Sequence, residues 1–132
     1  MPPTDERPGA GRVLVVDDQE DLCWVLRRLL EARGHVVATA PSAARARALF
    51  AELEAQVAVV DYRLPDGCGL DLAQELMLAP GAPRCILMTS YGNAALRARA
   101  AELGMFAYLD KPFANEAAVD CIERAMTGSF IS

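Results

Sequence analysis

At 132 residues the chain is long enough to bury a hydrophobic core, and a hydrophobic content of 53% excludes a disordered protein. Its formal net charge of −5 and the lack of a basic run argue against nucleic-acid binding, and no apolar run reaches the roughly 20 residues that span a bilayer. The four cysteines form no CxxC pair and fit neither a disulfide framework nor a zinc site, so we expect reduced thiols and a cytoplasmic location.

Apolar patterns typical of strands and helices alternate five times along the chain. The predicted strands cover residues 12–16, 35–40, 56–60, 84–88 and 105–109. The predicted helices cover residues 19–33, 42–53, 70–78, 93–103 and 115–126. Ser42 and Asn115 are expected to cap their helices at the N-terminus, and Gly34 and Gly104 to follow the ends of the first and fourth helices.

Five strand–helix units predict one α/β domain over residues 12–127, with a parallel sheet and helices on both of its faces. The first, third and fourth strands are nearly continuous apolar runs and should be buried, whereas the second is more mixed and suits a sheet edge. This favours the strand order 2-1-3-4-5 of the doubly wound, flavodoxin-like (βα)5 arrangement. Residues 1–11 are expected to form a flexible leader, and residues 128–132 a tail or the start of a linker.

Charged side chains directly follow three of the predicted strands. Asp17 and Asp18 follow the first strand, Asp61 follows the third, and Lys111 comes just after the fifth. Because the carboxyl ends of parallel strands meet at one edge of a sheet, we expect three carboxylates and one ammonium group in a single cleft. Crowded carboxylates repel unless a cation neutralises them, and oxygen ligands suit Mg²⁺. No His or Cys lies at these strand ends, which argues against Zn²⁺.

A carboxylate beside a bound metal can attack phosphorus and become an aspartyl phosphate. Asp61 is the candidate nucleophile because it ends a central strand alone and leads into a loop. Asp17 and Asp18, adjacent and at the start of a helix, are the candidate metal ligands. Lys111 and the hydroxyl of Thr89, which ends the fourth strand, could bond the phosphoryl oxygens. Each residue alone could be an ordinary cap, turn former or strand end, so the hypothesis depends on their coincidence at one edge.

Four segments that carry this chemistry stand in a recognisable order and spacing. They are Val15-Val16-Asp17-Asp18, Val59-Val60-Asp61-Tyr62-Arg63-Leu64-Pro65-Asp66-Gly67, Met88-Thr89-Ser90-Tyr91-Gly92 and Tyr108-Leu109-Asp110-Lys111-Pro112-Phe113. Together they resemble the receiver domain of two-component response regulators, the CheY-like family, over residues 12–126. The resemblance implies a phosphorylation-controlled switch that modifies itself and is not a turnover enzyme.

The resemblance also implies how the acidic residues divide their roles. Asp61 corresponds to the phosphoacceptor and to a metal ligand. Asp18 corresponds to the direct carboxylate ligand of Mg²⁺ or Mn²⁺, whereas Asp17 would act indirectly, through water or through Lys111. The backbone carbonyl of Arg63 corresponds to a further ligand of the same ion.

The switch and the partners follow from the same resemblance. Thr89 and Lys111 correspond to the residues that contact the phosphoryl group, and Tyr108 to the aromatic side chain that turns inward when Thr89 moves. The phosphodonor would be a phosphohistidine on a sensor histidine kinase or on a histidine phosphotransfer protein. Arg63 and Tyr91 stand two residues after the phosphoacceptor and the switch threonine, and we hypothesise that they partly shield the acyl phosphate from water.

The fourth predicted helix has a small apolar face, formed by Leu96, Ala100 and Leu103, so we expect it to be the element that moves. A homodimer through the fourth helix, the fifth strand and the fifth helix is a further expectation. Arg97 and Asp110 are among the charges of both signs on that surface.

Two other functions share parts of this pattern. A Mg²⁺-dependent phosphohydrolase with an aspartyl-phosphate intermediate would usually carry a second acid two residues after the nucleophile, where this chain has Arg63. It would also usually carry a cap domain, for which this chain has no room. A nucleotide-binding module would place its glycine-rich loop after the first strand, whereas Gly9 and Gly11 precede that strand.

Overall fold

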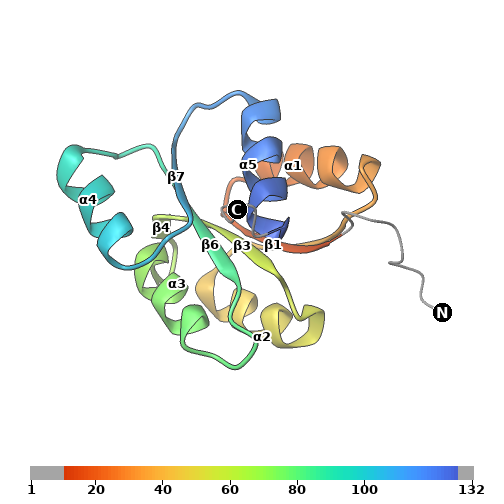
Figure 1. The fold of residues 1–132 in the computed structure, drawn as a ribbon, viewed down its shortest axis with the longest axis horizontal. Helices are drawn as coiled ribbons and strands as arrows, with labels where there is room; N and C mark the ends of the chain where they lie inside the picture. The colour runs from red at the N-terminus through yellow and green to blue at the C-terminus, as the bar shows by residue number, and fades with distance from the viewer. Residues whose placement is uncertain (1–10, 128–132) are drawn as a thin grey trace.

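Five parallel strands form one central sheet in the computed structural model, which describes residues 11–127 (Figure 1). In chain order these strands are β1 (Arg12–Val16), β2 (Val36–Ala40), β3 (Val57–Asp61), β6 (Arg84–Thr89) and β7 (Ala107–Asp110). Their order in the sheet is β2-β1-β3-β6-β7, which is the predicted 2-1-3-4-5 order, and β2 lies at an edge as expected. The predicted leader, apart from Gly11, and the predicted tail over 128–132 lie outside the described residues.

Five helices surround the sheet in this part of the chain. They are α1 (Glu20–Ala32), α2 (Ala43–Leu53), α3 (Gly69–Met77), α4 (Ala94–Glu102) and α5 (Asn115–Thr127). Figure 1 shows α1 and α5 together on one face of the sheet, and α2 and α3 on the other, with α4 beside the edge strand β7. None of the helices in residues 11–127 has both the length and the apolar character that a membrane-spanning segment requires.

Alternate side chains of β1 point into two separate cores. Val13 and Val15 pack in one core with α1 and α5, whereas Leu14 and Val16 pack in the other with α2 and α3. Each fully buried aliphatic side chain contributes about 1.5–3 kcal/mol to folding. A one-residue shift of the strand would exchange the two sets of side chains, so the cores fix the register of β1 in the sheet.

The helix α4 rests on the smallest buried cluster. Within Ala94–Glu102 only Ala100 is buried, and Leu96 is partly buried against Leu70 and Leu87. The small apolar face that the sequence predicted is therefore confirmed. Little buried area anchors this helix compared with the four others.

One of two predicted helix caps is present and the other is wrong. The hydroxyl of Ser42 accepts the N–H of Arg45 at 3.2 Å and caps α2 as expected. Asn115, in contrast, is the first residue of α5 and not its cap, because the N–H of Ala118 bonds the carbonyl of Ala114. The predicted start of the helix at residue 115 is therefore correct, but Asn115 is its first helical residue.

The segment after β3, which the sequence predicted as a loop, is a short antiparallel hairpin of β4 (Arg63–Leu64) and β5 (Gly67–Cys68). Asp66 at its tip accepts the N–H groups of Ala43 at 2.8 Å and Ala44 at 3.0 Å. These two bonds lower the pKa of Asp66 and satisfy free N–H groups at the start of α2. The hairpin is thereby fastened to α2.

Gly69 begins α3 at a point where the helix touches the end of β3. Its N–H donates to the carbonyl of Tyr62 at 2.7 Å, and a Cβ atom at this position would overlap the carbonyl oxygen of Asp61. Glycine is therefore required here to bring α3 against the strand end.

Gly69→Ala should lower the free energy of unfolding towards the upper end of about 1–3 kcal/mol, because the added methyl group meets backbone atoms and not a flexible side chain. Gly81→Ala is the matched control: Gly81 has a φ of 73° and no atom within 4 Å of a Cβ at that position. Only the cost of a left-handed residue, about 1 kcal/mol, applies there. Urea denaturation measures both losses, and equal losses would show that the close approach is not what requires glycine.

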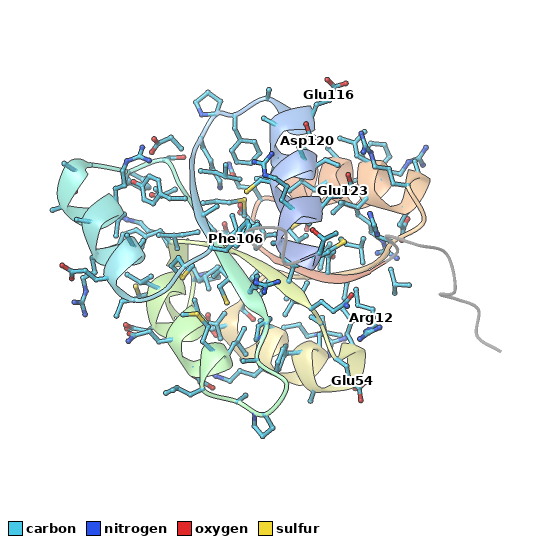
Figure 2. All side chains as sticks on the ribbon, in the orientation of Figure 1. Arg12, Glu54, Phe106, Glu116, Asp120 and Glu123 are labelled. Atoms are coloured by element: carbon cyan, nitrogen blue, oxygen red, sulfur yellow. The ribbon has the colours of Figure 1, made fainter. Side chains whose placement is uncertain are left out.

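His35 is a buried side chain that joins three parts of the fold. Its Nδ1 accepts the N–H of Gly11 at 2.9 Å, so its proton is on Nε2, which donates to Glu123 Oε2 at 2.8 Å. The guanidinium of Arg33 donates to the other oxygen of Glu123 at 2.8 Å. Glu123 is labelled on α5 in Figure 2. These contacts fasten the starts of β1 and β2 to α5.

Replacing this histidine tests the contribution of the network to stability. His35→Leu removes both bonds and should lower the free energy of unfolding by about 1–3 kcal/mol, the usual cost of leaving buried polar groups without partners. Arg27→Ala breaks the exposed Arg27–Glu31 pair, at 3.0 Å, and should cost less than about 1 kcal/mol. Thermal unfolding compares the two, and the network would be unimportant if His35→Leu cost no more than Arg27→Ala.

Candidate functional site

The carboxyl ends of β1, β3, β6 and β7 lie at one edge of the sheet and bring the predicted site residues together. The ammonium group of Lys111 lies 2.7 Å from Asp17 Oδ2 and 3.1 Å from Asp61 Oδ1. The backbone N–H of Lys111 donates to the carbonyl of Thr89 at 2.8 Å, which places the last residue of β6 beside the same group. Four residues that lie far apart in the sequence thus meet in one place.

Two of the three clustered carboxylates are buried, which is uncommon for charged groups. Asp17 is 1% exposed and Asp61 is 8% exposed, whereas Asp18 is exposed. Burial raises the pKa of Asp61, the charge of Asp17 raises it further, and Lys111 lowers it in part. Burial disfavours the charged form of Lys111, but its hydrogen bonds with Asp17 and Asp61 outweigh burial and its pKa rises. The ammonium therefore stays charged and holds together two carboxylates that would otherwise repel.

The carboxylate cluster fits a hard divalent cation. One oxygen each from Asp17, Asp18 and Asp61 lies within 4.8 Å of the other two. Both oxygens of Asp17 already accept hydrogen bonds, Oδ1 from the N–H of Gln19 at 2.9 Å and Oδ2 from Lys111. This arrangement leaves Asp18 and Asp61 as the oxygen donors best placed to bind an ion directly, and such donors suit Mg²⁺ or Mn²⁺.

Two side chains stack where the β4–β5 hairpin meets the loop between β6 and α4. The guanidinium carbon of Arg63 lies 4.0 Å from the centre of the Tyr91 ring. The N–H of Tyr91 donates to the buried hydroxyl oxygen of Thr89 at 2.8 Å. The sequence led us to expect Arg63 and Tyr91 beside the phosphoacceptor, but it did not predict their contact with each other or the link to Thr89.

Tyr108 of β7 is held by the side chains around it. The guanidinium of Arg97 lies 4.4 Å from the ring centre and forms an ion pair with Asp110 at 2.9 Å. The buried Tyr108 hydroxyl lies beside Asp110 and the backbone of Asn93 but makes no hydrogen bond of good geometry, and burial raises its pKa. A Cβ on Gly92 would overlap this hydroxyl, so the ring packs directly on the loop before α4. Arg97 and Asp110, which the sequence suggested for a dimer surface, pair with each other within the chain.

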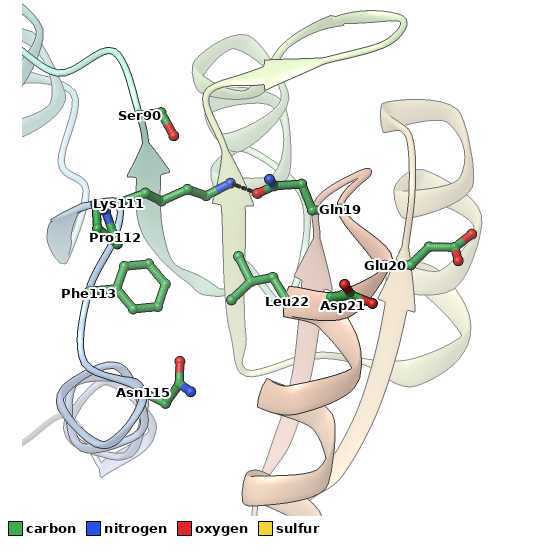
Figure 3. Close-up of a pocket in the computed structure, with 9 residues that line it drawn as sticks. All are labelled: Gln19, Glu20, Asp21, Leu22, Ser90, Lys111, Pro112, Phe113 and Asn115. Carbon is green, nitrogen blue, oxygen red and sulfur yellow. Dashed lines mark hydrogen bonds between the residues drawn. The ribbon is translucent and has the colours of Figure 1, made fainter.

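A groove of about 780 Å³ opens beside Lys111, between α1 and the segment that follows β7 (Figure 3). Leu22 and Phe113 line it, and the bond between Lys111 and Pro112 is cis. Figure 3 shows the side chains of Lys111 and Gln19 pointing at each other, with Lys111 Nζ donating to Gln19 Oε1 at 2.7 Å. The sequence marked Gln19 only as the start of a helix, and its neighbours along the chain gave no sign of the contact with Lys111.

Similarity to known proteins agrees with this geometry. Residues 13–123 match the family model of the response regulator receiver domain. The chain is 40% identical over 105 residues to the photosynthetic apparatus regulatory protein RegA of Cereibacter sphaeroides, covering 79% of this chain and 57% of the relative. It is 39% identical over 100 residues to the acid tolerance regulatory protein ActR of Rhizobium meliloti, covering 76% and 52%. The chain thus spans about half the length of these relatives.

Solved structures show the same fold. The non-phosphorylated HemR receiver domain of Leptospira biflexa superposes with a TM-score of 0.82 at 31% identity, covering 89% of this chain and 94% of that one. A response regulator protein of Burkholderia pseudomallei, solved with a phosphorylated aspartic acid, a calcium ion and citrate, superposes with a TM-score of 0.78 at 28% identity, covering 89% and 69%. The family model covers most of the chain, and we conclude that the chain belongs to the response regulator receiver domain family.

Proposed function

We propose that Asp61 accepts a phosphoryl group from a phosphohistidine on a sensor histidine kinase or a histidine phosphotransfer protein, in a reaction that needs Mg²⁺ or Mn²⁺. The observation that carries this proposal is the ammonium of Lys111, held between the buried carboxylates of Asp17 and Asp61. The phosphorylated aspartic acid in the related Burkholderia pseudomallei structure supports it. All four cysteines are free, which supports a cytoplasmic location.

The transfer uses groups that lie at the strand ends. An oxygen of Asp61 attacks phosphorus, the new O–P bond forms as the P–N bond to the donor histidine breaks, and the imidazole nitrogen takes back the electron pair. Lys111 donates to one phosphoryl oxygen and the hydroxyl of Thr89 donates to another. The groove beside Lys111 gives the donor side chain a route to the site.

The metal ligands follow the division of roles in the acidic cluster. Asp18, Asp61 and the backbone carbonyl of Arg63 would hold the ion, and Asp17 would act indirectly, since its oxygens are already engaged. A bound ion offsets negative charge on the phosphoryl oxygens. A turnover phosphohydrolase is the weaker alternative, because the residue two after Asp61 is Arg63, whose guanidinium stacks on Tyr91 and offers no second acid.

Phosphorylation would act as a conformational switch through Thr89 and Tyr108. To donate to a phosphoryl oxygen, the Thr89 hydroxyl has to move towards Asp61 and away from the N–H of Tyr91, whose hydrogen bond it now accepts, so the loop before α4 loses a restraint. Tyr108 can then leave a site where its buried hydroxyl makes no hydrogen bond of good geometry. The weakly anchored α4 follows, which shifts the population between two packings. A downstream partner, or a second copy of the chain, would bind the surface of α4, β7 and α5.

Asp61→Asn should abolish phosphorylation, because a neutral amide is too weak a nucleophile to attack phosphorus. The wild-type chain, incubated with Mg²⁺ and either a labelled phosphohistidine donor or acetyl phosphate, should take up one phosphoryl group, and EDTA should prevent it. Asp71→Asn, at an exposed position in the first turn of α3, should be labelled like the wild type. Label that persists in Asp61→Asn would contradict the assignment, and repeated turnover of a phosphate ester would favour the hydrolase.

The stacked side chains of Arg63 and Tyr91 should prolong the lifetime of the acyl phosphate on Asp61. Replacing Arg63 and Tyr91 together by alanine should shorten the half-life of the phosphorylated chain by roughly threefold to tenfold, the factor that one cation–π contact is worth. Arg28→Ala removes a similar contact, with Trp24 at 5.0 Å, on the outer face of α1 and should leave the half-life unchanged. The release of inorganic phosphate over time measures the half-life in the wild type and in both variants. An unchanged half-life in the double variant would exclude shielding.

A further inference from the structure

We propose that Gln19 is a positioning residue for phosphoryl transfer, which holds the Lys111 ammonium so that one N–H points at Asp61; this inference rests on the proposed function. The ammonium has three N–H donors and three acceptors surround it. They are Asp17 Oδ2 at 2.7 Å, Gln19 Oε1 at 2.7 Å and Asp61 Oδ1 at 3.1 Å. The two shorter contacts both come from the segment between β1 and α1, and the longest one comes from the phosphoacceptor.

Gln19 also departs from the local rule for its position. It occupies the N-cap of α1, yet its side chain makes no capping hydrogen bond. Short polar side chains are preferred at this position because their oxygen can bond the free N–H groups of the first turn. Here the backbone N–H of Gln19 donates to Asp17 Oδ1 at 2.9 Å, and the side chain reaches Lys111 instead. One residue therefore orients both members of the Lys111–Asp17 pair, and such departures from local preference tend to occur at functional sites.

The neutral amide suits this task better than a carboxylate would. Its oxygen accepts a hydrogen bond from the ammonium without adding a fourth negative charge to Asp17, Asp18 and Asp61. The charge of Lys111 is then shared with fewer anions and stays available to the phosphoryl group. Figure 3 shows this bond joining the α1 side of the groove to the segment after β7.

The arrangement predicts which contact changes during transfer. When an oxygen of Asp61 becomes bonded to phosphorus, the N–H that faces Asp61 is the donor nearest to the new phosphoryl oxygens. It can pass to one of them while the contacts with Asp17 and Gln19 persist. Lys111 then acts from a fixed position, and small errors in position are costly to a reaction rate.

Two substitutions distinguish the acceptor oxygen of Gln19 from the volume of its side chain. Both variants are labelled with acetyl phosphate and Mg²⁺. Gln19→Ala removes the acceptor and should lower the maximal rate of Asp61 labelling by roughly twofold to tenfold, as expected for one lost hydrogen bond at an exposed position. The acetyl phosphate concentration that gives half the maximal rate should not change. Gln19→Glu keeps an acceptor oxygen at the same reach and should restore a rate nearer to that of the wild type. Gln74→Ala on α3 is the matched truncation and should leave the rate unchanged.

Binding of Mg²⁺ alone gives a readout that does not depend on labelling. The chain has one tryptophan, Trp24, which lines a cavity with Asp17, so its emission can report the metal titration. Gln19→Ala should leave the affinity unchanged, and Gln19→Glu should tighten it because it adds a negative charge. The side chain of Gln19 is exposed and does not cap α1, so melting temperatures should match.

Three outcomes distinguish the failure of each idea. A wild-type rate in Gln19→Ala, with Asp61 still labelled, would overturn the role of Gln19 and leave the proposed function intact. Equal losses in Gln19→Ala and Gln19→Glu, with the same Mg²⁺ affinity in both, would also overturn it, because the added charge would then not be felt at the site and could not explain the loss in Gln19→Glu. Label that persists in Asp61→Asn would overturn the proposed function together with this inference.

Discussion

The attraction between one ammonium group and two buried carboxylates is the interaction on which the site depends. Asp61 is removed from water and lies close to the buried Asp17, and both effects disfavour its charged form. Lys111 offsets both effects at once. A buried charge left without its partner typically costs about 3–5 kcal/mol. The ends of β1, β3 and β7 are therefore mutually dependent, and a change at Asp61 is felt by groups from three different strands.

The structure sets this strongly held cluster beside a weakly held helix. The two large cores fix β1 and β3, so the acidic residues have little freedom to move. On the other side, α4 rests on a small cluster, and the buried Tyr108 hydroxyl makes no hydrogen bond of good geometry. A few hydrogen bonds gained at the phosphoryl group are comparable in free energy to the packing that holds α4. The free energy that phosphorylation could supply at the site is thus similar to the packing free energy that would be lost if α4 moved.

Local sequence patterns were sufficient for the fold, because apolar runs and turn residues act over a few neighbours. The same patterns predicted the acidic cluster at one edge of the sheet, because the residues that follow each predicted strand can be read directly from the sequence. They failed at Asn115, where one residue decides a helix start. They also missed the contact of Gln19 with Lys111, two residues 92 positions apart, and the pairing of Arg97 with Asp110. Such contacts depend on the directions of long side chains across a finished fold, and no short-range pattern records those directions.

The two faces of the sheet draw on different parts of the chain. The core with α2 and α3 is built from segments that lie close together in the sequence, whereas the other core needs α1 and α5 together. His35 and Glu123, 88 positions apart, join the same distant segments. During synthesis on the ribosome, the first face can close while the second still lacks α5. Nascent chains would then present the apolar side of α1 to chaperones until the final helix emerges.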